Sequence, residues 1–150
     1  MLNPHGRSAS VLALLAVMLA ACATAFQEPQ TRLVDARIDS ASVERIKTTF
    51  TVEIDNPNSV GAKVTRIRYT VFAEGVKVIE ENVKKDFEVK AKAKTRVDLP
   101  ARITPADLAA AGLAAALNRR VNYTLKGEVT IDTPIGDMTL PISDSGVLKW

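Results

Sequence analysis

The sequence predicts a mainly β fold, an antiparallel β-sandwich of about seven strands with one α-helix. The first observation is a period of two: across residues 46–55 apolar and polar side chains alternate strictly, as in a strand with one buried face. The second is turn chemistry that recurs between such segments, without the strand–helix–strand rhythm of parallel sheets. The third is size, because 150 residues, 47% of them apolar, suffice for one domain with its own core.

The first predicted strand covers residues 46–55 and is expected to be half-buried. Its inward set is Ile46, Thr48, Phe50, Val52 and Ile54, and its solvent set is Lys47, Thr49, Thr51, Glu53 and Asp55. Asn56-Pro57-Asn58-Ser59 ends this strand, because proline fixes φ and asparagine can cap its own backbone. Residues 64–80 form a predicted hairpin around Glu74-Gly75. The inward set of its first strand is Thr65, Ile67, Tyr69, Val71 and Ala73.

Two further strands surround a lysine-rich segment. Phe87 and Val89 close one, and residues 95–103 form the next, with Val97 and Leu99 inward. Pro100 indicates an edge position or a bulge, because proline donates no backbone hydrogen bond. Residues 90–94 (Lys-Ala-Lys-Ala-Lys) are either a solvated loop that discourages edge pairing or a contact for anionic headgroups, and we favour the loop.

Residues 104–117 are the predicted helix. Thr104 is the expected N-cap, Pro105 suits the first helical position, and Asp107 complements the positive end of the helix dipole. The alanine-rich run that follows has high helix propensity. Because residues 108–117 contain no lysine and no aromatic residue, we expect the helix to pack on the sheet rather than lie on a membrane surface.

Two strands complete the predicted sandwich. Residues 121–131 alternate, residues 132–137 turn the chain, and residues 138–142 return. Asp144-Ser145-Gly146 is expected to end the sheet, with residues 147–150 trailing. Tyr123 is interpreted as a core residue whose hydroxyl reaches the backbone. The residues interpreted as fixing turns are Pro57, Gly75, Pro134 and Gly136.

The amino terminus reads as a targeting signal. Residues 11–21 are uninterrupted and apolar and follow Arg7. As a helix they would rise only about 16 Å, short of the ~30 Å hydrocarbon core of a bilayer. A short apolar run behind a positive charge is typical of a secretory signal peptide. Residues 1–21 are therefore the predicted signal peptide.

Leu19-Ala20-Ala21-Cys22 resembles the bacterial lipobox, in which a peptidase cuts before a lipid-modified cysteine. The resemblance implies cleavage between Ala21 and Cys22 and a lipid on Cys22, the single cysteine of the chain. Two or three acyl chains make such attachment effectively permanent. The alternative is cleavage at Ala23-Thr24-Ala25, an ordinary A-x-A site that would discard Cys22.

The lipobox also sets the expected organisation and location. Residues 22–32 are the predicted lipidated cysteine and tether, and residues 33–150 are the predicted domain. Alanine at position 23, in place of aspartate, resembles the sorting signal of outer-membrane lipoproteins. We therefore expect a protein in the cell envelope, lipid-anchored to the outer membrane and facing the periplasm.

Composition excludes most catalytic chemistry. The single histidine, His5, lies in the predicted signal peptide, so the mature chain has no imidazole for nucleophilic catalysis or for the common zinc sites. A net charge of +3, without a basic cluster, argues against nucleic acid. Asp132 and Asp137 are too few ligands for calcium. The carboxylates that a glycosidase would need sit at predicted turns or on solvent faces: Glu53, Asp55, Glu80, Glu81, Asp132 and Asp137. We expect no enzyme, no metal and no cofactor.

An ordered set of motifs across about residues 33–148 resembles the late-embryogenesis-abundant type-2 domain and its smaller relative, the water-stress and hypersensitive-response (WHy) domain. The resemblance implies a fibronectin-III-like sandwich with one helix, no catalytic residues, and a link to desiccation, cold or envelope stress. The motifs are Asp55-Asn56-Pro57-Asn58, Ile67-x-Tyr69, Glu74-Gly75-Val76-Lys77-Val78, Tyr123-x-Leu125-x-Gly127-x-Val129, Pro134-x-Gly136, Leu140-Pro141-Ile142 and Gly146.

The expected function is that of a non-enzymatic, membrane-anchored lipoprotein that acts in desiccation or envelope stress by binding or stabilising envelope components. Its membrane contact would run through the lipid at Cys22. The alternative is a lipid-binding or lipid-transfer accessory module of the envelope, because the inward residues are medium-sized and few aromatic rings fill the centre. The sequence identifies no specific protein or lipid partner.

Overall fold

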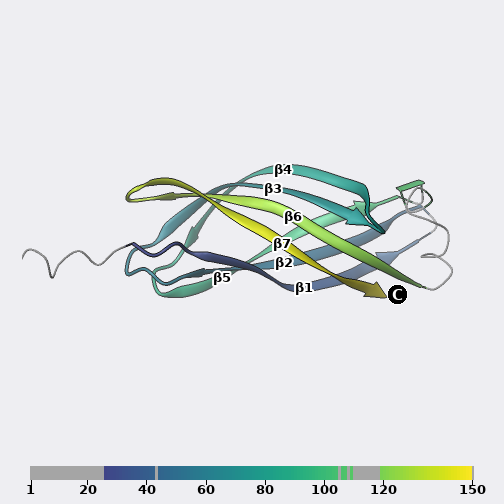
Figure 1. The fold of residues 1–150 in the computed structure, drawn as a ribbon, viewed down its shortest axis with the longest axis horizontal. Coiled ribbons are helices and arrows are strands. Elements are labelled where there is room, and N and C mark those ends of the chain that lie inside the picture. Colours follow the sequence, from purple (N-terminus) through teal and green to yellow (C-terminus); the bar gives the residue numbers. More distant parts are fainter. Residues whose placement is uncertain (1–25, 43, 105, 108, 110–118, 150) are drawn as a thin grey trace, which may run out of the picture.

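Seven antiparallel strands form two sheets. This computed structural model describes residues 26–149 apart from residues 43, 105, 108 and 110–118. One sheet has the order β1-β2-β5 and the other β4-β3-β6-β7 (Figure 1). The prediction of a mainly β, antiparallel sandwich of about seven strands is confirmed. The strands are β1 (Gln30–Ala41), β2 (Ile46–Asn56), β3 (Ala62–Ala73), β4 (Val76–Val89), β5 (Ala93–Ile103), β6 (Arg120–Thr133) and β7 (Gly136–Lys149).

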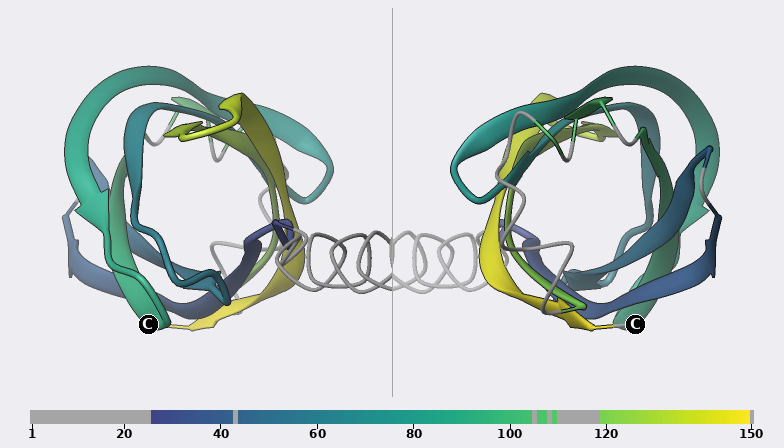
Figure 2. Two further views of the ribbon diagram at one scale, coloured as in Figure 1. Left: turned by 90° about the vertical axis from the view of Figure 1, so that its left-hand side faces the viewer. Right: turned by 90° about the vertical axis from the view of Figure 1, so that its right-hand side faces the viewer.

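The two sheets curve around a common core. Viewed along the long axis, their strands follow a nearly closed outline (Figure 2). β1 lies beside β7 at one seam, where the Thr31 hydroxyl donates a hydrogen bond to the Pro141 carbonyl. β5 is an edge strand of its sheet, which agrees with the edge position predicted from Pro100. The side chains that point inward are the alternate residues of each strand, as the pleat requires.

Aromatic side chains from both sheets join across the core. Phe50 on β2 is fully buried and meets Tyr123 on β6 edge to face, with ring centroids 5.2 Å apart. The Tyr69 hydroxyl on β3 donates a 2.6 Å hydrogen bond to the Pro100 carbonyl on β5. Burial disfavours the phenolate and raises the pKa of Tyr69 to about 12. The core position of Tyr123 is confirmed, but in the described part of the chain it is Tyr69 whose hydroxyl reaches the backbone.

Three strand boundaries differ from the prediction. β1 was not recognised as a strand, and its first residues, 30–32, fall within the range predicted as tether. Residues 76–89 form one continuous strand, β4, where the sequence suggested two separate pieces. β7 continues to Lys149, paired with Arg120, so Asp144-Ser145-Gly146 does not end the sheet. The predicted number of strands is right, although the chain is divided differently.

Turn and bulge geometry sets the register of β3. Glu74 and Gly75 connect β3 to β4 with φ of 46° and 82°, the two positive values of a two-residue type I′ turn. Both ladders of β3 shift register between Val64 and Arg66. Against β6 the extra residue is Thr65, which forms a β-bulge on β3, whereas against β4 the extra residue lies on β4, between Lys84 and Phe87. The inward positions of Ile67, Tyr69, Val71 and Ala73 are confirmed, but Val64, and not Thr65, is buried beyond the bulge.

The described residues contain no helix element, and most of the predicted helix, residues 104–117, lies outside them; only contacts at its predicted start are described. The Thr104 hydroxyl and backbone N–H donate to Asp107 Oδ2 at 2.7 and 2.8 Å, and the Asp107 N–H donates to Thr104 Oγ1 at 3.3 Å. This reciprocal pattern is a capping box, as the expected N-cap at Thr104 requires. Pro105, Leu108 and residues 110–118 are not among the described residues.

The sandwich has two distinct ends along its long axis (Figure 1). At one end the N-terminal segment, residues 26–29, meets the β2–β3, β4–β5 and β6–β7 connections at residues 57–61, 90–92 and 134–135; we call this the entry end. The β3–β4 turn and the end of β7 lie at the opposite, far end. Within the described ranges, no helix has the length and apolar character needed to cross a membrane.

Candidate functional site

The predicted lipidation and cleavage residues, Cys22 and Ala21, lie outside the described residues. The described chain begins at Phe26, four positions after Cys22, at the entry end. How the sandwich holds this segment therefore determines how an anchor at Cys22 would be joined to the domain. The contacts below are built from β2 outward, because β2 carries the residues that hold the segment.

The Asn56-Pro57-Asn58 motif holds the entering chain. The Asn58 side chain donates to the Gln27 carbonyl at 2.7 Å and accepts from the Gln27 N–H at 2.8 Å, as a neighbouring strand would. Asn56 donates its amide hydrogens to the Val60 and Lys90 carbonyls at 2.9 and 3.2 Å. Its Oδ1 accepts from both the backbone and the side chain of Asn58, at 3.1 and 3.0 Å. Both asparagines are buried, so the motif predicted as a turn is also a clamp.

Glu53 contradicts its predicted place on a solvent face, because its side chain is only 3% exposed. Arg32 on β1 donates to Glu53 Oε1 from Nε at 3.1 Å and from Nη2 at 2.7 Å. Arg96 on β5 donates to Oε2 at 3.1 Å, and Lys94 Nζ lies 3.5 Å from Oε1. The three side chains meet because β2 is the central strand, and Arg32 and Arg96 are its register partners at Glu53.

This arrangement keeps Glu53 ionised. The hydrogen bonds from Arg32, joined by those from Arg96 and the charge of Lys94, outweigh desolvation and lower the pKa of Glu53 to about 2. A carboxyl group held as an anion in this way cannot serve as a general acid near neutral pH. Its oxygens are also fully engaged by cations. Glu53 is therefore a structural charge.

We expect Glu53→Gln to unfold at a lower temperature than the wild type at pH 7, since the amide loses the charge that three cations face. The folded pKa of Glu53 is about 2 against an ordinary 4.5, so its stabilisation is complete above about pH 4.5 and disappears as the pH falls towards 2. The difference between the two melting temperatures should shrink across that window in circular-dichroism melts. Glu81→Gln, which changes an exposed carboxylate on β4, is the control. A difference that stayed constant down to pH 2 would contradict this account.

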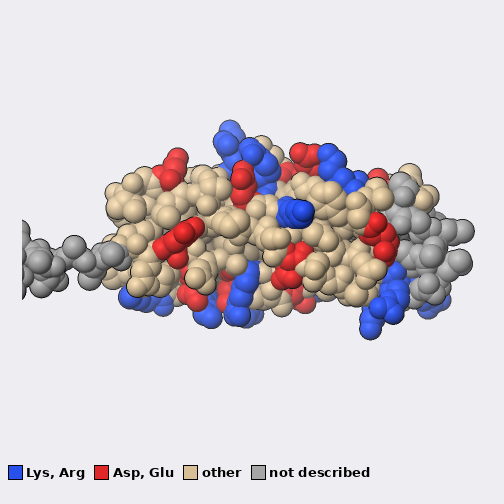
Figure 3. All heavy atoms as spheres, viewed as in Figure 1, with Lys and Arg blue, Asp and Glu red and all other residues tan. Residues whose placement is uncertain are grey.

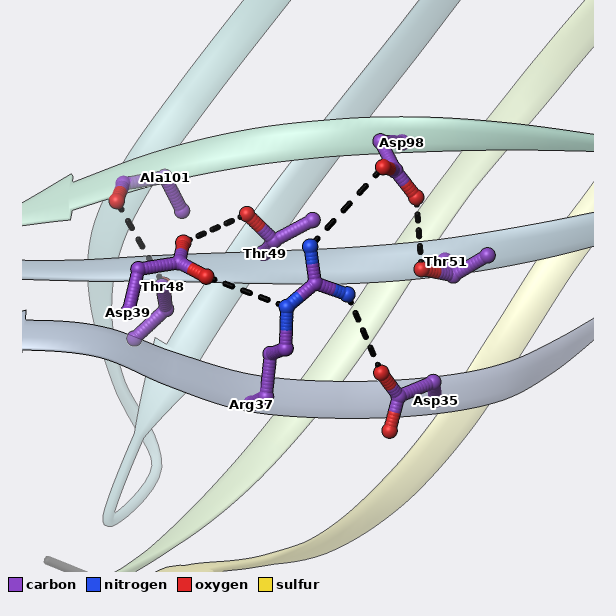
Figure 4. A network of polar contacts seen from close by, with 8 residues as sticks. All are labelled: Asp35, Arg37, Asp39, Thr48, Thr49, Thr51, Asp98 and Ala101. Atoms are coloured by element: carbon purple, nitrogen blue, oxygen red, sulfur yellow. Dashed lines mark hydrogen bonds and ion pairs between the residues drawn. The ribbon is translucent and has the colours of Figure 1, made fainter.

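A second polar network covers the outer face of the β1-β2-β5 sheet (Figure 4). The Arg37 guanidinium contacts the carboxylates of Asp35 and Asp39 at 3.1 Å each and that of Asp98 at 3.9 Å. The Thr49 hydroxyl donates to Asp39 and the Thr51 hydroxyl to Asp98, each at 2.6 Å. The hydrogen bond from Arg37 to Asp35, with the charges nearby, raises the pKa of the guanidinium.

This network explains why β2 is not half-buried as predicted. Thr49 and Thr51 are each only 8% exposed, although they face away from the core. Long side chains from both neighbouring strands lie over them, which a central strand permits and an edge strand does not. The inward set of β2 is confirmed in full, and the solvent set is wrong at Thr49, Thr51 and Glu53.

The remaining candidate carboxylates form no metal-binding cluster in the described part of the chain. Glu80 pairs with Lys77 at 2.7 Å, which lowers the pKa of the carboxyl. Asp132 and Asp137 are register partners beside the β6–β7 turn. Among the described residues, no three His, Cys, Asp or Glu side chains lie close enough together to hold a metal ion.

The lysine run divides between the β4–β5 connection and the start of β5. Lys94 belongs to the Glu53 cluster and also lies 3.6 Å from Asp55. Lys92 has φ of 52°, its N–H donates to the Asn58 carbonyl at 2.9 Å, and its ammonium donates to the Pro57 carbonyl. Lys90 is exposed. Residues 90–92 form the connecting loop, as we favoured, but Ala93 and Lys94 already belong to β5. The loop is hydrogen-bonded to the clamp on the entering chain.

Comparison with known proteins agrees with this architecture. The family model of the late embryogenesis abundant protein, LEA_2, matches residues 51–146. The "Desiccation protectant protein Lea14 homolog" of Glycine max is 23% identical over 127 residues, which cover 84% of each chain. The "Desiccation-related protein PCC27-45" of Craterostigma plantagineum is 22% identical over 124 residues and 82% of each chain.

Solved structures give the same result. A solution structure of a protein from Arabidopsis thaliana aligns with a TM-score of 0.69 and 25% identity, and the match covers 85% of each chain. A crystal structure of an Archaeoglobus fulgidus protein aligns with a TM-score of 0.59 at 14% identity, covering 84% of this chain and 98% of that one, and shows the shared fold alone. The chain therefore belongs to the LEA_2 late embryogenesis abundant family, a family of non-enzymatic, desiccation-related proteins.

Proposed function

We propose that this protein is a lipoprotein, anchored through Cys22 to the outer membrane on its periplasmic side, that limits envelope damage during water loss by binding or stabilising envelope components. The family and its desiccation-related relatives support the protective role. Leu19-Ala20-Ala21-Cys22 supports the anchor, and alanine at position 23 supports the outer membrane.

One observation carries the proposal: a lipobox that ends at Cys22 is followed after five positions by a residue that the domain clamps. The Asn58 side chain holds both backbone groups of Gln27. Only residues 23–26 separate the lipid-bearing cysteine from this clamp. A lipid at Cys22 would thus hold a folded domain close to the membrane surface, without a long flexible linker.

The polar groups of the domain, both buried and on one outer face, support a role under water loss. Every fully buried side-chain nitrogen and oxygen among the described residues has a hydrogen-bond partner. On the outer face of the β1-β2-β5 sheet, charged side chains pair with one another, as around Glu53 and Arg37. Because these groups do not depend on water alone for partners, the fold should tolerate dehydration.

The alternative of a lipid-binding or lipid-transfer module needs space between the sheets. Inward side chains of both sheets, such as Phe50, Ile67 and Leu125, are fully buried. The hollows that described residues line open instead at the entry end and its adjoining strand ends, for example around Phe26, Pro57 and Ile135. We therefore place the activity on the surface of the sandwich.

The Cys22→Ser variant tests the anchor and the function together. We expect wild-type protein to incorporate labelled palmitate and to fractionate with the outer membrane, and the variant to do neither. The intact mass of the mature wild-type protein should equal that of a chain that begins at Cys22 and carries added acyl chains. An intact mass that matches a wild-type chain beginning at Phe26 would instead establish cleavage after Ala25 and contradict the anchor.

The protective role is tested in a deletion strain of the source organism. The wild-type gene should restore survival after drying, and the Cys22→Ser gene should not, although circular dichroism shows the same fold for both proteins. Equal survival of the deletion strain and its parent after drying, freezing and osmotic shock would contradict the protective role.

A further inference from the structure

The entry end is a single preformed surface made from four chain segments. The clamp joins residues 26–29 to the β2–β3 connection through Asn58 and Gln27. Asn56 joins both to the β4–β5 connection through the Lys90 carbonyl at 3.2 Å, and the Lys92 N–H returns to Asn58. The β6–β7 turn lies across a hollow of about 550 Å³ from these segments. The hydrogen bonds fix three of the segments against one another, so the side chains at this end are presented together.

Two large apolar side chains are exposed on this surface. Ile135, at the tip of the β6–β7 turn, is 68% exposed, and Val60 is 42% exposed. Among the described residues, only Val147 shares this property, and it lies towards the far end. Turn positions usually carry Gly, Asn, Asp or Ser, so an exposed isoleucine at a hairpin tip lacks the usual turn chemistry. Ile135, Val60 and Lys92 line the same hollow.

The four segments of the entry end carry two lysines and one acidic residue, Glu28. Lys90 and Lys92 are exposed on the β4–β5 connection, and the Lys92 ammonium also donates to the Pro57 carbonyl. The strand ends beside these segments carry the acidic residues Asp55, Glu88, Asp132 and Asp137. Lys90 has no ion-pair partner in the described ranges. In the face shown in Figure 3, both signs of charge are mixed along the sandwich, while the outermost part of the entry end is mostly uncharged.

The length of chain before the clamp places this surface near a bilayer. Phe26 is four positions after Cys22, and four fully extended residues span at most about 14 Å. The headgroup layer on each side of the hydrocarbon core is roughly 6 Å thick. An acyl group on Cys22 would therefore hold Phe26 at most about 8 Å beyond the headgroup layer, and in contact with it when the tether is less extended.

We infer that the entry end is a membrane-contact surface, in which Ile135 and Val60 enter the headgroup layer and Lys90 and Lys92 lie at anionic phospholipid headgroups. The inference rests on the proposed anchor at Cys22. It adds an orientation: the long axis of the sandwich stands away from the bilayer, with the β3–β4 turn and the end of β7 pointing into the aqueous compartment.

An environment-sensitive dye tests this orientation in the lipidated, full-length mature protein. Because Cys22 would carry the lipid, Ile135→Cys supplies the only free thiol for labelling. Val147→Cys is the matched control, since Val147 is also a large, exposed apolar residue but lies towards the far end. On vesicles of phosphatidylethanolamine and phosphatidylglycerol, the dye at position 135 should shift to shorter wavelength and be quenched by headgroup-labelled lipid. The dye at position 147 should report water.

Charge reversal tests the role of the lysines. Each lysine near an anionic surface strengthens binding about five-fold. Lys90→Glu removes one positive charge and adds one negative charge, so in the Ile135→Cys background it should lower the ratio of docked to undocked domains by about 30-fold. Lys47→Glu changes an exposed lysine at the far-end start of β2 and should have no effect. Replacing phosphatidylglycerol by phosphatidylcholine should act as Lys90→Glu does.

The outcomes separate this inference from the proposed anchor. If intact mass shows the lipid and the protein stays on vesicles while the dye at position 135 reports water, the contact surface is wrong and the anchor stands. Equal shifts at positions 135 and 147 would also overturn it, because the domain would then lie flat. A shift that grows with protein concentration in the absence of vesicles would indicate a second copy of the chain, not a membrane. A mature protein without lipid would overturn both proposals.

Discussion

Phe50→Ala is expected to lower the free energy of unfolding by about 3–5 kcal/mol, the range for emptying a buried phenylalanine site. Phe50 is fully buried on the central strand of its sheet and meets Tyr123 of the other sheet edge to face. Removing the ring leaves a cavity between the sheets and also removes an aromatic pair worth about 0.5–1.5 kcal/mol. Urea denaturation followed by circular dichroism measures the loss.

Phe72→Ala is the matched control for this prediction. Phe72 lies on the outer face of β3, half-buried, with the Lys126 ammonium 5.8 Å from its ring centroid. Its loss should cost about 1 kcal/mol or less, since an exposed cation–π contact is worth only about 0.5–1 kcal/mol. If the two variants were destabilised equally, the inner and outer faces of the β-sandwich would be misassigned.

Gly127→Ala is expected to cost about 3 kcal/mol, at the upper end of the usual range for overpacking. A Cβ at position 127 would lie 2.5 Å from the Arg68 carbonyl oxygen and 3.0 Å from the Tyr69 Cα. Both are backbone atoms of the paired strand β3, so no side chain can move aside and the two strands must separate. Tyr69 also joins the two sheets through its hydrogen bond to the Pro100 carbonyl. Moving the Tyr69 backbone would therefore disturb the core as well.

Gly61→Ala is the control for Gly127→Ala. A Cβ at position 61 would lie 3.2 Å from the Glu88 carboxylate, the far end of a flexible side chain, and 3.3 Å from the Val89 carbonyl oxygen, which needs to shift by only a few tenths of an ångström. The expected change is within about 1 kcal/mol, measured by the same denaturation experiment. Equal stability of the two variants would mean that β3 and β6 are not as close at Gly127 as the structure places them.

The sequence predicted the strands whose two faces differ strongly in polarity. The alternation of β2 correctly identified its inward side chains, such as Phe50 and Val52, because burial on that face depends only on the period of the strand. The Glu74-Gly75 turn was also predictable, since few residues accept two positive φ values. These features are local, so neighbouring residues suffice to predict them.

Irregular and edge strands were harder to predict. β1 has register shifts between Leu33 and Asp35 and between Ile38 and Ser40, and these interrupt its alternation. β4 is an edge strand whose middle, residues 80–86, is mostly charged or polar, so no apolar face is visible there. In β7, Gly146 was interpreted as a terminator. It lies instead beneath Tyr123, whose ring leaves no room for a Cβ.

The Glu53 cluster could not be predicted because its members are far apart in the chain. Arg32 is 21 positions before Glu53 and Arg96 is 43 positions after it. They meet only once β1 and β5 are placed on either side of β2 in the correct register. The clamp is an intermediate case: the Asn-Pro-Asn motif indicated a turn, but not that Asn58 would bind Gln27.

The position of β1 also has a mechanical consequence. β1 follows the clamped N-terminal segment, is hydrogen-bonded in its sheet to β2 alone, and pairs with it from Gln30–Asp55 to Ala41–Ile46. A pull on the N-terminus along the long axis, resisted at the far end, is directed parallel to this ladder. The hydrogen bonds of the ladder are then loaded in shear and resist together, whereas a sideways pull would open them one after another. If the domain is anchored through Cys22, as we propose, the β1–β2 ladder would let it resist a pull from its N-terminus without unfolding strand by strand.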